Sequence, residues 1–165
     1  MFAGSTATAS LEVWSDASFA PEGSRSRSGG VITLSGSPLT WWSTKQSVTA
    51  WSVCEAETDG LATAMSEASK VLPLLEALTG RSFDSHVKMF GDNSASITVA
   101  NRETFFVKTW RTRAFALRAS WLRDQIRNQN VLLQHHPGAT LVADMLTKVL
   151  SKTKLAELRS SAGFK

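Results

Sequence analysis

The sequence predicts an α/β protein in which a five-stranded mixed β-sheet is flanked by helices. Three apolar or β-branched runs lie close together near the start of the chain, and this spacing favours an antiparallel meander. Helical periodicity then alternates with two further strand patterns, which is typical of a mixed sheet with helices around it. With 165 residues, the chain is long enough for one domain with a sizeable core.

The first three strands are predicted from alternation and from turn residues. Residues 11–16 alternate between apolar and polar side chains and lead into a turn-prone stretch over 18–28, which is rich in Ser, Gly and Arg. A β-branched run over 30–34 is the second strand. The Gly-Ser-Pro sequence at 36–38 predicts a turn, after which residues 39–45 form the third strand.

A long helix is predicted over 51–78, where the apolar residues take up a helical period. Val53, Glu57 and Leu61 share one stripe of this helix because they are spaced four residues apart. Pro73 should kink the stretch or split it into two helices.

The second half of the chain alternates strands with helices. Residues 87–90 form a short strand and 93–100 a short helix. A clear helix covers 109–128, the last strand covers 131–134, and residues from 141 onward are helical again.

The tryptophans are assigned to core or surface by their spacing. In the helix over 109–128, Trp110 and Trp121 fit a buried apolar stripe better than a platform for stacked bases. Trp41 and Trp42 would point to opposite faces of a regular strand, so we expect one of them to be exposed. The two apolar stripes of the helix consist of Trp110, Ala114, Leu117 and Trp121, and of Phe115, Leu122 and Ile126.

The composition is that of a globular protein with an excess of positive charge. The net charge of +4 suits a polyanionic partner. The single Cys54 excludes an intrachain disulfide and a cysteine-based zinc site, which fits an intracellular setting, cytoplasmic or nuclear. No apolar stretch reaches the ~20 residues of a membrane span. Residues 1–10 lack the features of a signal peptide and are expected to be a flexible lead-in to one domain over 11–165.

Four acidic residues, Asp16, Glu57, Asp92 and Asp144, are the strongest functional signal. Each is weak evidence by itself, because an Asp at a strand end is usually a turn or cap residue, and an acid in a first helical turn is favoured by the helix dipole alone. Glu57, however, lies in an apolar stripe that would point toward the strand ends carrying Asp16 and Asp92. Converging carboxylates repel one another unless cations bind them, and hard oxygen ligands favour Mg²⁺ or Mn²⁺.

Five motifs occur in the order seen in ribonuclease H domains of copia-type retrotransposons, which the chain resembles from about residue 11 to residue 163. The resemblance implies the ribonuclease H fold, a five-stranded mixed sheet whose first three strands are antiparallel. The motifs are Asp16-Ala17-Ser18, Leu39-Thr40-Trp41-Trp42-Ser43-Thr44-Lys45-Gln46, Cys54-Glu55-Ala56-Glu57, Gly91-Asp92-Asn93-Ser94-Ala95 and Ala143-Asp144-Met145-Leu146-Thr147-Lys148.

The same resemblance implies a role for each acid in a site with two divalent metal ions. Asp16 resembles the carboxylate that bridges both metals, and Asp92 resembles the ligand at the end of the fourth strand. Asp144 resembles the ligand of the metal that activates the attacking water, and Glu57 that of the metal on the leaving-group side. Glu55 is the alternative for this last role, but a helical apolar pattern follows Glu57, as in the family.

The implied activity is cleavage of the RNA strand of RNA–DNA hybrids by two-metal-ion hydrolysis, which leaves a 5′-phosphate and a 3′-hydroxyl. Two Mg²⁺ ions would be the cofactor, with Mn²⁺ as the alternative. The expected protein partner is an upstream reverse transcriptase domain of the same polyprotein, and no membrane partner is expected. Two alternatives stay open: a catalytically inactive nucleic-acid-binding module on the same fold, and another nuclease of this superfold, such as a transposase or integrase core.

The chain departs from the family pattern at several positions. The loop over 137–140 has no His, although His135 and His136 lie just before it, where a structural role and a role in product release are both open. Thr112-Arg113-Ala114 stands where the family usually has Thr-Lys-His, and Val149 stands where Pro is usual. None of these departures removes a predicted metal ligand.

A run of basic residues between 108 and 127 predicts a surface that contacts nucleic acid. Such a ridge would bind phosphates without sequence preference, and the alternative is an ordinary solvated helix face. Asn93 is a candidate for a minor-groove contact, since hybrids are recognised by groove shape and the 2′-hydroxyl. The basic residues are Lys108, Arg111, Arg113, Arg118, Arg123 and Arg127.

Overall fold

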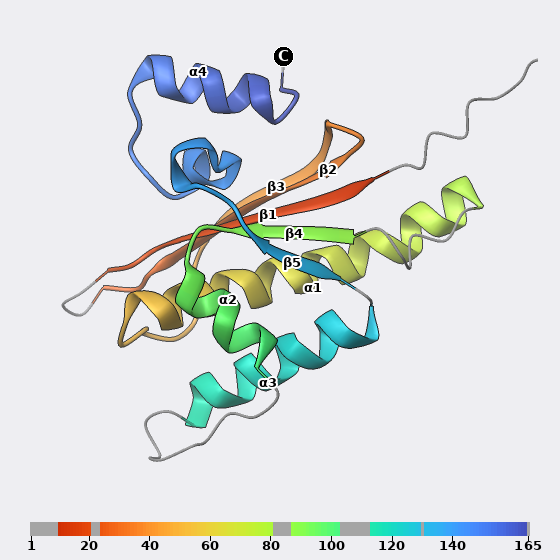
Figure 1. Cartoon of the computed structure of the whole chain (residues 1–165). Helices are drawn as coiled ribbons and strands as arrows, with labels where there is room; N and C mark the ends of the chain where they lie inside the picture. Colours follow the sequence, from red (N-terminus) through yellow and green to blue (C-terminus); the bar gives the residue numbers. More distant parts are fainter. Residues whose placement is uncertain (1–9, 21–23, 81–86, 103–112, 130, 165) are drawn as a thin grey trace, which may run out of the picture.

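A single sheet with helices on both faces forms the described part of the chain (Figure 1). The predicted lead-in at the start of the chain falls almost entirely outside that part and stays a prediction. The computed structural model describes residues 10–20, 24–80, 87–102, 113–129 and 131–164.

The sheet has five strands in the order β3-β2-β1-β4-β5. β1 pairs antiparallel with β2 and β2 with β3, whereas β1 pairs parallel with β4 and β4 with β5. This mixed sheet, with its first three strands antiparallel, confirms the predicted fold class. The strands are β1 (Leu11–Ser18), β2 (Arg27–Leu34), β3 (Ser37–Lys45), β4 (Val87–Gly91) and β5 (Leu132–His135).

The helices divide between the two faces of the sheet. α1, α2 and α3 lie together on one face, and α4 lies on the opposite side with the short 3-10 helix η3 (Figure 1). The elements are α1 (Val53–Thr79), α2 (Ser94–Asn101), α3 (Arg113–Asn128), η2 (Gly138–Thr140), η3 (Val142–Leu146) and α4 (Lys152–Ser161).

The hairpin between β2 and β3 turns earlier than predicted. Its two turn residues, Ser35 and Gly36, both have positive φ, 49° and 79°, as the central residues of a type I′ turn do. The predicted turn over 36–38 is confirmed only at Gly36, because β3 already begins at Ser37 and is an edge strand, where proline is tolerated. β2 likewise begins at Arg27, before its predicted start.

α1 is one helix of 27 residues with a capping signal at each end. The side chain of Ser52 accepts a hydrogen bond from the Glu55 N–H, and Gly80 ends the helix in the left-handed conformation. The helix continues through Pro73, so of the two predicted outcomes, a kink or a split into two helices, the split is wrong. Good helix formers on both sides of Pro73 offset the one backbone hydrogen bond that proline removes.

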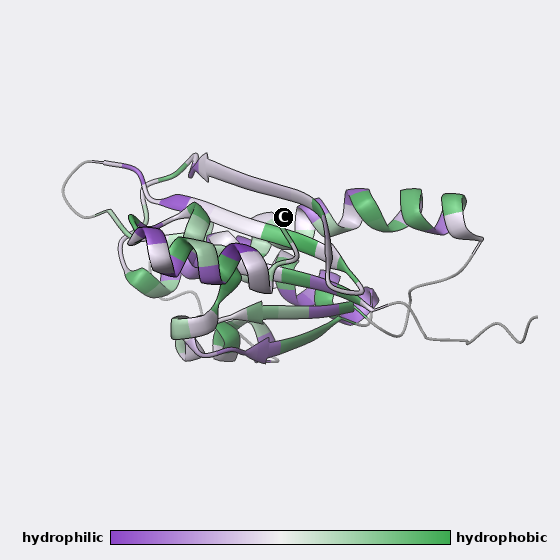
Figure 2. Cartoon of the chain, turned by 90° about the horizontal axis from the view of Figure 1, so that it is seen from above, coloured by the Kyte–Doolittle hydropathy of each residue, from purple (hydrophilic) through white to green (hydrophobic). Residues whose placement is uncertain are grey.

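The core lies between the sheet and the first half of α1. Val13 of β1 packs in one cluster with Leu61 and Met65 of α1, and none of the three is more than 2% exposed. The buried residues of α1 end at Ala68. Beyond it, the helix extends past the strands (Figure 1, Figure 2), and some of its hydrophobic side chains are exposed. The exposed side chains of this end include Leu74 and Leu78.

α3 turns a different face to the core from the one expected of its tryptophans. Leu122 and Ile126 are buried as predicted, but Leu117 and Trp121 are 63% and 40% exposed, so the predicted core position of Trp121 is wrong. Trp110 lies outside the described residues. The buried face of α3 also contains the small residues Ala116 and Ala119. Small side chains let α3 approach α1 closely, which the larger stripe would prevent.

Of the two adjacent tryptophans in β3, one is exposed as predicted. Trp41 is 56% exposed and meets Phe164 edge to face, with their ring centroids 5.1 Å apart. Trp42 packs against the core cluster on the other face of the strand.

The helix predicted from residue 141 onward is interrupted. η3 ends at Leu146 and α4 begins only at Lys152. The prediction of continuous helix fails because side chains of the intervening turn contact the sheet instead: the hydroxyl of Thr147 donates a hydrogen bond to Asp16. In the described part of the chain, none of the helices has the length and hydropathy of a membrane span.

Replacing Gly30 with Ala is expected to destabilise the sheet strongly. A Cβ atom at this position would collide with the indole ring of Trp42 and lie 2.6 Å from the carbonyl oxygen of Trp14. The free energy of unfolding, measured by urea denaturation, should fall by about 2 kcal/mol or more. Gly91→Ala is the control, because its Cβ would make ordinary contacts at 3.4 Å and beyond. Equal losses in both variants would contradict the steric explanation.

Candidate active site

Three carboxylates from three elements meet at one end of the sheet. Asp16 lies in β1, Asp92 directly follows β4, and Glu57 lies in the second turn of α1. One oxygen of each carboxylate lies within 4.8 Å of the others. Because β1 and β4 run parallel, the strand ends that carry Asp16 and Asp92 lie at the same edge. The structure thus brings together three of the four predicted acids.

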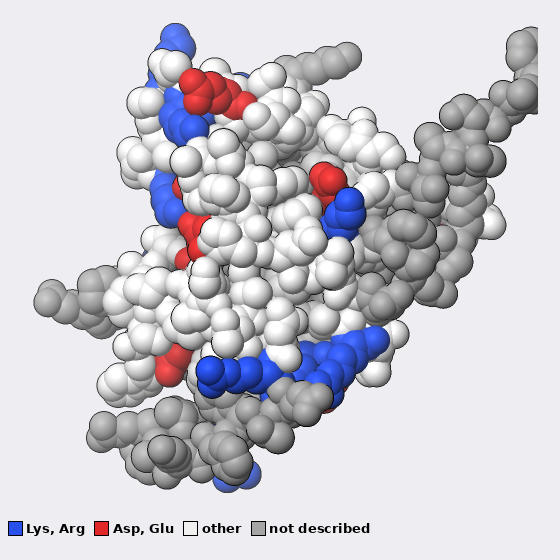
Figure 3. Space-filling model, viewed as in Figure 1, with Lys and Arg blue, Asp and Glu red and all other residues white. Residues whose placement is uncertain are grey.

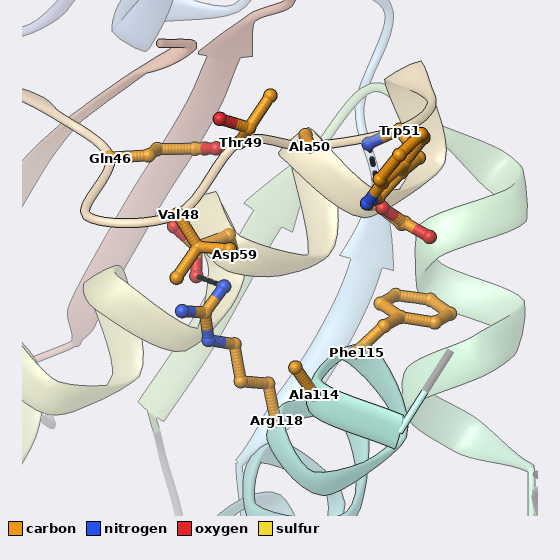
Figure 4. Close-up of a pocket in the computed structure, with 10 residues that line it drawn as sticks. Gln46, Val48, Thr49, Ala50, Trp51, Asp59, Ala114, Phe115 and Arg118 are labelled. Atoms are coloured by element: carbon orange, nitrogen blue, oxygen red, sulfur yellow. Dashed lines mark hydrogen bonds and ion pairs between the residues drawn. The ribbon is translucent and has the colours of Figure 1, made fainter. Parts of the chain in front are cut away.

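Glu57 and Glu55, the two candidates for the same ligand position, lie in different places in the structure. The carboxylate of Glu55 caps the start of α1: its Oε2 accepts a hydrogen bond of 2.7 Å from the backbone N–H of Trp51, beside a small hollow between α1 and α3 (Figure 4). The side chain of Glu57 is buried, and it is the one that joins Asp16 and Asp92.

Asp144, the fourth predicted acid, lies next to this trio. It occupies the first turn of η3, and its side chain is 13% exposed. In the described residues, it is not a member of the group whose oxygens lie within 4.8 Å of one another. The Nζ of Lys148 links it to the trio, because it lies 2.8 Å from Asp144 Oδ1 and 3.4 Å from Asp16 Oδ1.

Thr147 and Lys148 are site residues to which the sequence interpretation assigned no role. The Thr147 hydroxyl donates to Asp16 Oδ2, and Lys148 Nζ lies beside Asp16 Oδ1, so both oxygens of Asp16 have partners. Lys148 Nζ is also 4.0 Å from Asp92 Oδ2. The four-residue spacing from Asp144 to Lys148 was a signal for an ion pair, but it does not predict contact with the two strands.

Side chains of β2 and β3 hold the turn of Thr147 in place. The hydroxyl of Ser43 donates a hydrogen bond of 2.5 Å to the carbonyl of Leu146, and Arg27 donates to the Ser43 oxygens. A Cβ on Gly29 would lie 2.7 Å from the methyl group of Thr147. The absence of a side chain at position 29 therefore allows the turn to lie directly on β2.

Gln46 joins the end of β3 to the start of α1. Its amide Nε2 donates to the hydroxyl of Ser28 at 2.9 Å and to the carbonyl of Ala56 at 2.8 Å, and the residue is buried. These two bonds fix the first turns of α1 against the sheet. They thereby set the position from which Glu57 reaches the strand ends.

Burial and the neighbouring charges shift the pKa values of several groups in the carboxylate cluster. Burial raises the pKa of Glu57 to about 9, and the neighbouring charges of Asp16 and Asp92 add to the rise. Burial also raises the pKa of Asp144, against the effect of its hydrogen bond from Lys148. The pKa of Lys148 is raised by its hydrogen bond to Asp144 and by the surrounding carboxylates, which outweigh its burial.

The donor set of this cluster fits a hard divalent cation. Asp16, Glu57 and Asp92 offer carboxylate oxygens within 4.8 Å of one another, the ligand type that Mg²⁺ and Mn²⁺ prefer. Burial, together with repulsion from Asp16 and Asp92, disfavours the ionised form of Glu57 and raises its pKa. A divalent cation would relieve that repulsion.

The two histidines before the loop lie in different environments. His136 meets the rings of Trp14 and Phe90 edge to face, with centroids 5.0 Å and 5.8 Å away, and its Nε2 lies 3.0 Å from the Thr140 hydroxyl. His135 is exposed at the end of β5. The contacts of His136 favour the structural role that the sequence left open for it.

Among the predicted nucleic-acid-binding residues that the structure describes, Arg118 and Arg123 have partners within the protein. Arg113 is exposed, and Lys and Arg side chains gather near α3 in Figure 3. Arg118, however, pairs with Asp59 at 2.7 Å beside the hollow shown in Figure 4. Arg123 is only 5% exposed and donates to the carbonyl of Arg102, so its predicted place on the ridge is wrong. Lys108 and Arg111 lie outside the described residues.

Asn93 caps α2. Its side-chain oxygen accepts a hydrogen bond of 2.9 Å from the Ser96 N–H, and it directly follows Asp92 in the chain. The cap uses the oxygen of the amide. This hydrogen bond does not test the proposed minor-groove contact by Asn93, which stays a prediction.

Solved structures of ribonucleases H share this architecture. The ribonuclease H1 of the halophilic archaeon Halobacterium salinarum NRC-1 superposes with a TM-score of 0.58 at 18% identity, over 82% of this chain and 92% of that one. The N-terminal ribonuclease H domain of rv2228c from Mycobacterium tuberculosis gives 0.60 at 14% identity, over 94% and 98%. LC11 ribonuclease H1, solved in complex with an RNA/DNA hybrid, gives 0.59 at 17% identity, over 82% and 92%.

No family model matches the sequence. At identities of 14–18%, the likeness to solved structures establishes the fold and not the activity. The order and directions of the five strands agree with it independently. The chain has the ribonuclease H fold.

Proposed function

We propose that this protein is an endoribonuclease that cleaves the RNA strand of RNA–DNA hybrids with two divalent metal ions. The observation that carries the proposal is the meeting of Asp16, Glu57 and Asp92 at the ends of two parallel strands of a ribonuclease H fold. A purely structural role explains this arrangement poorly, because bringing together three mutually repelling carboxylates, two of them buried, destabilises the fold.

Each acid has a defined part in the proposed reaction. Asp16, Glu57 and Asp92 would hold the metal ions, and Asp144 would complete the set from η3. When bound, the ions would supply Lewis acidity and an activated water for phosphodiester hydrolysis, with a 5′-phosphate and a 3′-hydroxyl as the expected products. Thr147 orients the Asp16 carboxylate by its hydrogen bond, and the buried Gln46 holds the start of α1 that carries Glu57.

The proposed biological setting is reverse transcription of a copia-type retrotransposon, inside the cell. Its support is the order of the five motifs along the chain, including the tryptophan-containing segment over residues 39–46. An upstream reverse transcriptase domain is the proposed partner, and it would contribute affinity for the hybrid. Arg113, Asn93 and the basic residues over 108–111 are the proposed contacts of the chain itself.

A substrate panel tests the proposed substrate class. The purified chain is incubated with Mg²⁺ or Mn²⁺ and labelled RNA–DNA hybrid, duplex DNA or single-stranded RNA. We expect cleavage of the hybrid alone, confined to the RNA strand. Cutting of duplex DNA would instead favour a transposase-like or integrase-like nuclease.

A second function, binding without catalysis, is favoured by one specific observation. The ammonium group of Lys148 lies among the carboxylates of Asp16, Asp92 and Asp144, and thus supplies positive charge to the cluster without a metal. An inactive module could keep its acids in this way. Hybrid binding without cleavage, even when the reverse transcriptase domain is added, would support that function.

A further inference from the structure

Lys148 reaches into the carboxylate cluster from the solvent side. Its Nζ lies 2.8 Å from Asp144 Oδ1, 3.4 Å from Asp16 Oδ1 and 4.0 Å from Asp92 Oδ2. In the described part of the chain, Lys148 is the single basic residue within ion-pair distance of these three acids. A single ammonium group therefore stands where three predicted metal ligands converge.

The ammonium group of Lys148 competes with a metal ion for the carboxylate of Asp16. Asp16 is fully buried, and its two oxygens are taken by the Thr147 hydroxyl and by Lys148. The hydrogen bond from Thr147 leaves acceptor capacity on Asp16 Oδ2, so the group that competes with a cation is the ammonium beside Oδ1. The ammonium of Lys148 and a divalent ion next to Asp16 would also repel each other over a few ångströms.

Lys148 can leave the cluster without unfolding anything around it. Its side chain is 40% exposed, so solvent already borders the ammonium group. The backbone of the turn is held independently, by the hydrogen bond from Ser43 to Leu146 and by the Lys148 N–H to the carbonyl of Asp144 at 3.0 Å. Rotation about the side-chain bonds of Lys148 is enough to vacate the space.

We propose that Lys148 is the resident counter-ion of this site, and that divalent metal ions bind by displacing its ammonium group. The apparent metal affinity is then set by competition with Lys148, and the metal-free protein keeps its acids together through this residue. The inference rests on the proposed function, in that the cluster must bind divalent metal.

The test compares Mn²⁺ binding, by isothermal titration calorimetry at one pH, in the wild type, Lys148→Met and Lys148→Arg. The neutral Lys148→Met should bind Mn²⁺ at least about tenfold more tightly, because the competing charge is gone. Lys148→Arg keeps a competing charge and should stay within about threefold of the wild type. Lys152→Met is the matched control, since Lys152 is exposed in the first turn of α4 and its distant charge is screened.

Thermal unfolding provides a second readout that does not depend on activity. In EDTA, Lys148→Met should melt below the wild type, because its carboxylates are no longer neutralised, and saturating Mn²⁺ should remove that difference. Unchanged or weaker Mn²⁺ binding by Lys148→Met, with normal binding by the wild type, would overturn the inference and leave the proposed function standing. Absence of binding in the wild type and every variant would overturn both.

Discussion

Replacement of Asp92 by Asn is expected to reduce cleavage of an RNA–DNA hybrid by roughly 10³-fold or more, because a lost metal ligand removes several kcal/mol of transition-state stabilisation. The substitution keeps the shape of the side chain. Shape matters here because the Asp92 carboxylate lies close to Gly138: a Cβ on Gly138 would lie only 2.7 Å from Asp92 Oδ2. Asp16→Asn should have the same effect, since both acids belong to the group within 4.8 Å.

Hybrid binding distinguishes a chemical defect from a folding defect in these variants. Binding, measured by fluorescence anisotropy in Ca²⁺ or EDTA, should persist in Asp92→Asn, because phosphate contacts elsewhere supply the affinity. Asp124→Asn is the matched control: Asp124 is exposed on α3, so its loss should leave cleavage unchanged. Wild-type rates of cleavage by Asp92→Asn would refute the site.

The second large effect concerns the stability of the metal-free protein at different pH values. Folding raises the pKa of Glu57 from 4.5 to about 9, so the folded state binds a proton more tightly than the unfolded state does. The stability that this group contributes is fully present below about pH 4.5 and is lost as the pH rises through 9. In EDTA, the unfolding temperature of the wild type should therefore fall across this range.

The variant Glu57→Gln isolates this contribution, because a neutral amide does not titrate. Its unfolding temperature in EDTA should fall less than that of the wild type between pH 5 and 9, and the two curves should diverge toward alkaline pH. Glu157→Gln, which removes a largely exposed carboxylate in α4, should parallel the wild type. Parallel curves for Glu57→Gln as well would contradict the raised pKa.

The sequence predicts the sheet well because its patterns reflect the two faces of each strand. In β1, Leu11 and Val13 are fully buried, whereas Glu12 and Trp14 on the other face of the strand are half-buried, as period-two patterning requires. The position of the β2–β3 turn was harder to predict, because Ser35 takes a positive φ that Ser rarely adopts, whereas Pro38 marked a turn by composition.

The orientation of α3 could not be read from amphipathicity alone. Both stripes of that helix are apolar, and the choice between them depends on what α1 and α2 present. α3 packs through Ala116, Ala119 and Leu122, and Trp121 is left partly in solvent. Periodicity identifies a helix and its candidate faces, but the neighbouring helices select the buried one.

The acids of the site were predictable, and the residues that position them were not. Asp16 and Asp92 follow apolar strand patterns, so their meeting at one edge follows from parallel pairing of β1 and β4. Thr147 and Lys148 reach Asp16 across more than 130 positions of the chain. Such contacts depend on the exact path of a turn after η3, which no local pattern specifies.

Incubation of the wild-type chain with a hybrid labelled on its RNA strand, in Mg²⁺ and in EDTA, tests the proposed enzyme most directly. We predict short labelled RNA products in Mg²⁺, none in EDTA, and an intact DNA strand in both. Cleavage that persists in EDTA, or an RNA strand that stays intact in Mg²⁺ and Mn²⁺ even with the reverse transcriptase domain present, would contradict a metal-dependent ribonuclease at Asp16, Glu57 and Asp92.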